Sequence, residues 1–231
     1  VVRVVSPGTL TDAGYLDAKE PAFLLAIAPS GDTATSKGAA PVIGTALIDV
    51  STGEFSVAEY SGETGRQALG EELRVLAPRE LVVSEDLDLG ATVPGGHDLS
   101  IPVTRVDAWS FGFDRARDIL LDQLRAGGLE GFGLANRPLA VSAAGALVRY
   151  LRDTQKVDLA HVRTVSFREH ADVLLVDPTT MDHLEVVEGA EGTREGSLLA
   201  ELDRTQTSMG ARLLRGWLLR PLARLEPILD R

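Results

Sequence analysis

Three short apolar segments follow one another between residues 23 and 60. The first, residues 23–28, is nearly continuously apolar, which is typical of a central strand buried on both faces. The second and third, residues 43–50 and 55–60, are separated by Ser51-Thr52-Gly53-Glu54. A short glycine-containing connection between two such segments predicts an antiparallel hairpin. The chain is therefore expected to start its fold with a β-sheet.

Helices and strands alternate after this hairpin. Apolar residues keep the spacing of one helical face from Ala68 to Leu76, and Pro78 ends that helix. The elements expected from there on are a helix at residues 63–77, strands at 81–83 and 103–106, and helices at 114–126 and 138–155. Trp109 is expected to cover the sheet at the start of a helix. Three neighbouring strands followed by strand–helix alternation predict an α/β fold, a ribonuclease-H-like mixed sheet flanked by helices.

The pattern changes after Lys156, where extended segments are short and helical signals follow. Ser197 is expected to cap a short helix, and Thr207 or Ser208 a second helix that Pro221 ends. We therefore expect a boundary near residue 158. The expected organisation is a linker at residues 1–20, a ribonuclease-H-like domain at 21–158 and an incomplete, mainly helical domain at 159–231.

Composition excludes several classes of protein. The chain has no cysteine, which excludes disulfides and thiolate metal sites. No run approaches the roughly 18 apolar residues of a membrane-spanning helix, so no membrane association is expected. The net charge is −11, whereas a protein that grips duplex DNA by itself usually carries a basic surface. The chain lacks a signal peptide and an initiator methionine, so we expect a piece of a longer protein.

A ribonuclease-H-like order suggests a nuclease, whose two Mg²⁺ ions need clustered carboxylates on the sheet. The first strand contains no carboxylate, and Asp49 and Glu54 are expected to be turn and edge residues. A phosphate-binding loop, a zinc-protease motif and a G-x-S-x-G elbow are also missing from the sequence. We therefore predict no catalytic, cofactor-binding or metal-binding residue. A nuclease or resolvase stays the alternative, favoured if the chain cleaves branched or hybrid nucleic acid with Mg²⁺ and Asp49→Asn abolishes the cleavage.

Arginines gather in and near the last helices. We single out Arg204, Arg212 and Arg215, of which the last two share a helical face because they are three residues apart. Two interpretations stay open. These arginines form a solvated face that pairs with Glu201 and Asp203, or they contact another domain of the parent protein or the DNA backbone.

Several segments match a known pattern in the same order along nearly the whole chain. They are residues 1–9 (VVRVVSPGT), 46–55 (ALIDVSTGEF), 76–81 (LAPREL), 131–133 (GFG), 143–147 (AAGAL), 150–156 (YLRDTQK), 202–205 (LDRT) and 207–222 (TSMGARLLRGWLLRPL). Together they resemble the connector domain and the start of the core domain of the MutS family of DNA mismatch repair proteins. One departure matters: Asp182-His183 stand where the family has an Arg-Asn pair, so the role of that pair is not carried over.

The resemblance implies a role for the chain within a larger protein. The implied parent is a homodimeric, cytoplasmic and nucleoid-associated bacterial sensor that binds mismatched duplex DNA, uses ATP and Mg²⁺, and recruits the protein MutL. This chain is implied to be a non-catalytic connector without a cofactor of its own, which holds MutL and relays between the mismatch-binding end and the ATPase end. Its implied MutL surface comprises Asp114, Arg117, Asp118, Asp122 and Arg125. A paralogue without mismatch binding is a further alternative.

Overall fold

The computed structural model describes residues 21–29, 41–50, 52–155, 159–169, 173–174 and 176–230. Beyond residue 21 the chain forms two compact units, the first with residues 22–70 and 77–168 and the second with residues 71–76 and 169–231. The linker expected at residues 1–20 lies outside the described residues. The domain boundary expected near residue 158 stays a prediction.

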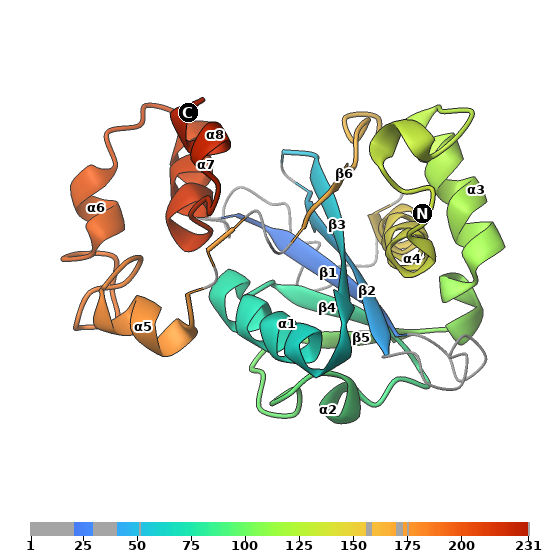
Figure 1. Cartoon of the computed structure of the whole chain (residues 1–231), viewed down its shortest axis with the longest axis horizontal. Coiled ribbons are helices and arrows are strands. Elements are labelled where there is room, and N and C mark those ends of the chain that lie inside the picture. Colours follow the sequence, from blue (N-terminus) through green and yellow to red (C-terminus); the bar gives the residue numbers. More distant parts are fainter. Residues whose placement is uncertain are drawn as a thin grey trace. The chain divides into compact units, whose positions relative to one another are not determined.

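The first unit is built on a mixed sheet whose described strands follow the order β5-β4-β1-β2-β3-β6 (Figure 1). β2 and β3 form the expected antiparallel hairpin, with Asp49 opposite Glu54, and β1 is antiparallel to β2. β4 runs parallel to β1, β5 to β4 and β6 to β3. The bounds are β1 (Phe23–Pro29), β2 (Val42–Asp49), β3 (Glu54–Ser61), β4 (Glu80–Ser84), β5 (Val103–Val106) and β6 (Ser166–Phe167).

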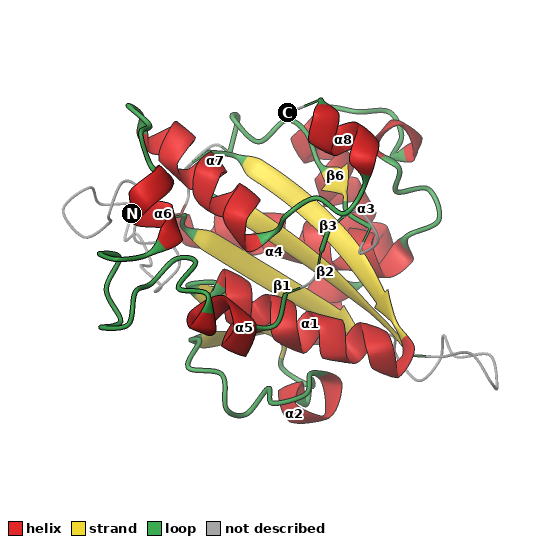
Figure 2. Cartoon of the chain, turned by 60° about the vertical axis from the view of Figure 1, so that its left-hand side comes forward, coloured by secondary structure: helices red, strands yellow, loops and turns green. Residues whose placement is uncertain are grey.

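Helices cover both faces of this sheet. The helical segments are α1 (Gly62–Leu76), α2 (Leu89–Thr92), η1 (Ala108–Phe111), α3 (Phe113–Leu124), η2 (Glu130–Phe132) and α4 (Pro138–Gln155). Of α1, residues 62–70 belong to the first unit and residues 71–76 to the second. α4 packs on β1, β2 and β3, with α3 beside it, and α1 lies on the other face (Figure 1). Figure 2 shows α4 behind the strands. The α/β fold expected from the sequence, a mixed sheet flanked by helices, is confirmed.

The main core lies between the sheet and the two helices α3 and α4. Leu24 and Ile48 of the strands belong to the same buried cluster as Leu120 of α3 and Leu147 and Leu151 of α4. These helix positions recur every three or four residues, so each helix turns one apolar stripe inward. The opposite stripe of α3 is consequently left facing solvent.

The N-terminus of α4 is tied to strand β3. The Glu59 carboxylate accepts hydrogen bonds from the backbone N–H groups of Leu139 and Ala140, both at 3.1 Å. These N–H groups have no partner within their own helix, so Glu59 caps α4 from a distant strand. Gly44 of β2 permits the close approach, because a Cβ at this position would lie 2.1 Å from the backbone carbon of Leu139. The position of α4 on the sheet is therefore fixed at its first turn.

The second unit is mainly helical. Its helices are α5 (Pro178–His183), α6 (Leu198–Leu202), α7 (Ser208–Leu219) and α8 (Leu225–Leu229). The expected caps are confirmed: the Ser197 hydroxyl accepts a hydrogen bond from the Ala200 N–H of α6, and Thr207 caps α7 through the Gly210 N–H. None of the helices among the described residues combines the length and apolarity needed to cross a membrane.

α5 is a helix that the sequence pattern did not predict. Asp177 caps it by accepting hydrogen bonds from the Thr180 hydroxyl and from the Thr180 backbone N–H. These bonds hold the pKa of the Asp177 carboxyl below its ordinary value of 3.8, and the bond from the Thr180 hydroxyl has the largest effect. Pro178 stands at the first helical position, where its missing N–H costs nothing.

Candidate interaction surface

The solvent-facing side of α3 carries four residues of the expected partner surface, and the fifth, Arg125, is the residue that directly follows the helix. Asp114, Arg117, Asp118, Asp122 and Arg125 are each exposed. The three aspartates are four residues apart and lie on one face of the helix. Arg117 is 3.2 Å from the Asp118 carboxylate. The structure thus brings these residues together as one mixed-charge face; whether a partner binds there stays a prediction.

Trp109 lies in η1, directly before α3, and its side chain is 42% exposed. The expectation that it covers the sheet is wrong. The guanidinium carbon of Arg149, from α4, is 3.8 Å from the ring centroid of Trp109, and that of Arg115, from α3, is 5.0 Å away. Contacts of this kind are attractive because the ring face carries partial negative charge. The indole is therefore held in place by two cations while it stays open to solvent.

Phe113 extends this aromatic feature onto α3. It is the first residue of the helix and its side chain is also 42% exposed. A hollow of about 280 Å³ adjoins Trp109 and is lined in part by Ser110, Arg149 and Tyr150. Exposed aromatic rings next to arginines are typical of the residues that dominate protein interfaces.

A second hollow, of about 340 Å³, lies where α3 ends. Its lining includes Arg125, Arg152, Arg163 and Gln123. Arg152 is fixed there, because its guanidinium donates to Oε1 of Gln123 at 2.8 Å and pairs with Asp122 at 2.9 Å. The sequence did not single out Arg152, Arg163 or Gln123, because nothing local marks them as neighbours.

Gln123 is the residue that organises this end of α3. Its side chain is buried, and its amide nitrogen donates to the backbone oxygens of Leu159 and Val162 at 2.8 and 2.9 Å. Its amide oxygen accepts from Arg152. One side chain therefore links α3, α4 and the segment around residues 159–163.

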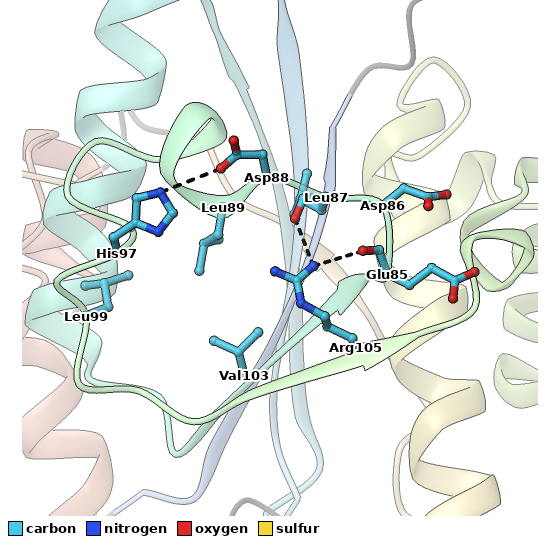
Figure 3. Close-up of a pocket in the computed structure, with 10 residues that line it drawn as sticks. Glu85, Asp86, Leu87, Asp88, Leu89, His97, Leu99, Val103 and Arg105 are labelled. Atoms are coloured by element: carbon cyan, nitrogen blue, oxygen red, sulfur yellow. Dashed lines mark hydrogen bonds and ion pairs between the residues drawn. The ribbon is translucent and has the colours of Figure 1, made fainter.

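A third hollow, of about 590 Å³, opens beside the ends of β4 and β5 and is lined by acidic residues, His97 and Arg105 (Figure 3). The Arg105 guanidinium donates to the backbone oxygens of Glu85 and Leu87 at 3.0 and 2.9 Å, so part of its donor capacity is used by the chain itself. His97 lies 3.8 Å from Asp88, and both side chains are well exposed. Among the described residues that line the hollow there is no serine or threonine, and none of them forms a nucleophile beside a positioned base.

The sheet carboxylates are scattered. Asp49 is buried at the end of β2, whereas Glu54 is exposed at the start of β3. β1 carries no acidic residue. Within the described ranges, no three His, Asp or Glu side chains gather closely enough to hold a metal ion.

The three arginines near the C-terminal helices occupy different surroundings. Arg204 is exposed in the connection before α7 and donates to the backbone oxygen of Asp203 at 3.2 Å. Arg212 and Arg215 lie on α7 and are partly buried. The Asp203 carboxylate is engaged by Arg194 and by the Thr205 N–H. Whether these arginines contact another domain or DNA stays a prediction.

Comparison with known proteins finds family matches for residues in both units. A family model described as MutS domain II matches residues 23–163, and a model described as MutS domain III matches residues 179–231. The chain is 38% identical to the DNA mismatch repair protein MutS of Roseiflexus castenholzii over 264 residues, which cover 97% of this chain and 23% of that protein. It is also 38% identical to the protein of the same name from Symbiobacterium thermophilum, over 99% of this chain and 25% of that protein. The chain thus spans about a quarter of the length of these curated relatives.

Proposed function

The chain belongs to the MutS family of DNA mismatch repair proteins, and on that premise we propose that it is a connector that docks the partner protein MutL. The connector catalyses no reaction. It relays conformational changes between the mismatch-reading part and the ATP-hydrolysing part of a longer parent. That parent is a homodimer in the bacterial cytoplasm, associated with the nucleoid, which binds mismatched duplex DNA and uses ATP and Mg²⁺. The chain itself needs no cofactor.

The observation that carries the docking proposal is the exposed aromatic pair at the start of the charged α3 face. Trp109 and Phe113 are each 42% exposed, and Arg149 and Arg115 hold the Trp109 ring. A ring that is already fixed loses little conformational freedom when a partner covers it. The charged stripe beside it supplies orientation, because charges around an apolar centre select the partner and its register.

Trp109→Ala tests this docking surface. We expect the variant to bind purified MutL from the same organism at least about tenfold more weakly, because truncating an aromatic anchor typically costs about 2 kcal/mol or more. Affinity is measured by biolayer interferometry with the chain immobilised. Circular dichroism should show an unchanged fold, since the Trp109 ring is not part of the buried core.

Met209→Ala is the matched control for this experiment. Met209 is 69% exposed and belongs to the second unit. The substitution therefore removes a similarly exposed apolar side chain outside the proposed surface. MutL should bind this variant like the wild type. Undiminished binding of Trp109→Ala, or an equal loss in both variants, would contradict the proposed surface.

The non-catalytic character gives a separate expectation. The purified chain should hydrolyse no ATP and cleave no branched or hybrid nucleic acid with Mg²⁺, because β1 supplies no carboxylate to a metal pair. It should bind matched and mismatched duplexes equally weakly at physiological salt, because its net charge of −11 opposes the phosphate backbone. Fluorescence anisotropy with the two duplexes measures the second point. A clear preference for the mismatch, or cleavage that Asp49→Asn abolishes, would overturn the assignment.

A further inference from the structure

We propose that the hollow at the end of α3 binds a carboxylate of the docked protein partner between Arg125, Arg152 and Arg163. The inference rests on the proposed docking function and adds the chemistry that the partner must present there. The hollow measures about 340 Å³, which is room for an aspartate or glutamate side chain.

The positive charge of this hollow is held in place by the chain itself. The Arg152 guanidinium is bound by Gln123 and by Asp122, and Gln123 is in turn fixed by the backbone oxygens of Leu159 and Val162. Arg163 donates from Nε to the Ala160 backbone oxygen at 2.9 Å, which orients its guanidinium. Within the part of the chain that the structure describes, its Nη groups stay available to a ligand. Such pre-positioning lowers the cost of ordering long side chains on binding.

The described residues of the hollow also carry unbalanced charge. Its lining contains three arginines and one aspartate, Asp122, which already pairs with Arg152. No acidic side chain of the described residues pairs with Arg125 or Arg163. Arg125 itself adopts the left-handed conformation that ends α3, with φ of 52°. Planar guanidinium groups bind carboxylates through two parallel hydrogen bonds, so an acidic side chain is the matching ligand.

The surroundings favour a protein over a nucleic acid as the source of this anion. Asp114, Asp118 and Asp122 form an exposed acidic stripe on the same helix, and the chain carries a net charge of −11. A phosphate backbone is negative along its whole length and would meet repulsion on this stripe. A protein partner can place an acidic residue at the arginines and basic residues along the aspartates, which matches both signs.

The test compares charge variants of the hollow for binding to MutL. Arg163→Glu should weaken the affinity by about tenfold, because it removes one cation and adds an anion where the carboxylate binds. Arg125→Asn, with a residue that accepts the left-handed conformation, should weaken it several-fold. Both variants should also reduce the salt dependence of the affinity between roughly 50 and 300 mM NaCl, a range that includes physiological ionic strength, where the Debye length is about 8 Å. Arg74→Glu, an exposed arginine of α1 outside the hollow, is the matched control.

The outcomes separate this inference from the docking proposal. Loss of affinity in the two hollow variants with Arg74→Glu unchanged supports the carboxylate site. If all three variants bind MutL as tightly as the wild type, the carboxylate site is overturned and the docking proposal stands. Failure of the wild type to bind MutL overturns both. If Arg163→Glu lowers the affinity for duplex DNA and leaves the affinity for MutL unchanged, the hollow binds phosphate, and the inference is overturned.

Discussion

Replacing Gly145 with alanine should destabilise the first unit by about 2 kcal/mol. Gly145 lies in α4 where the helix meets α3, and a Cβ at this position would be 2.3 Å from Cα of Ala116. The obstructing atoms belong to the backbone of α3, which cannot move aside as the end of a flexible side chain can. The added methyl group must therefore push the two helices apart. Urea unfolding followed by circular dichroism measures the loss.

Two effects oppose each other in this substitution, and their magnitudes decide the sign. Alanine favours a helix over glycine by roughly 1 kcal/mol, because glycine loses more backbone freedom on folding. Overpacking of a close helix contact costs roughly 1–3 kcal/mol, and more where backbone atoms collide. The steric term therefore exceeds the gain in propensity at Gly145.

Gly216→Ala isolates the propensity effect. Gly216 lies inside α7, and no atom lies within 4 Å of the position that a Cβ would take. Alanine at this position should stabilise α7 by about 0.5–1 kcal/mol, seen as a rise in helicity and slower amide exchange in that helix. If Gly145→Ala behaved like Gly216→Ala, the close packing of α3 on α4 would be contradicted.

Local signals explain why much of the first unit could be predicted from the sequence. The turn around Gly53, between two apolar segments, predicted the β2–β3 hairpin, and Pro78 marked the end of α1. The apolar spacing of Phe113, Ala116, Leu120 and Leu124 also indicated one buried side of α3. The last three are buried, whereas Phe113, the first residue of the helix, is exposed. The exposed face of α3 followed by exclusion, because 3.6 residues per turn leave the intervening positions outside.

The missed features depend on long-range contacts or on very short elements. The sequence indicated a short extended segment at residues 165–167, where β6 lies, but not its parallel pairing with β3, which joins segments more than a hundred residues apart. α5 carries a clear start signal, Asp177-Pro178, but its six residues are too few for an apolar period to show. Trp109 was placed inside because large aromatic rings are mostly buried, whereas two arginines stabilise it at the surface.

The hollow at the end of α3 could not be predicted, because it depends on contacts between residues far apart in the sequence. Arg125, Arg152 and Arg163 are separated by 27 and 11 positions and lie on three different segments. Only the packing of α3 on α4, and the buried amide of Gln123, brings their guanidinium groups together. A single buried polar residue thus connects the fold to the surface proposed to bind the partner.

Replacing Gln123 with glutamate should destabilise the first unit by about 3 kcal/mol, although the side chain keeps its shape and gains an ion pair with Arg152. The Gln123 amide nitrogen donates to the backbone oxygens of Leu159 and Val162. A carboxylate at this position would place an oxygen, which can only accept, against these two backbone oxygens, which also only accept. Each backbone oxygen would lose its donor, at about 1–3 kcal/mol for a buried group, and the charge would be desolvated because the side chain is 8% exposed.

The pH dependence of this variant distinguishes the hydrogen-bond argument from simple loss of packing. A protonated glutamic acid carries one O–H donor, so Gln123→Glu should recover part of its lost stability at low pH, relative to the wild type at the same pH. Gln123→Leu has similar volume and no donor at any pH, so its deficit relative to the wild type should not change with acidity. Urea midpoints at pH 7 and pH 5 for the three proteins give the comparison. A Gln123→Glu protein as stable as the wild type at pH 7 would show that the two backbone oxygens do not need the amide.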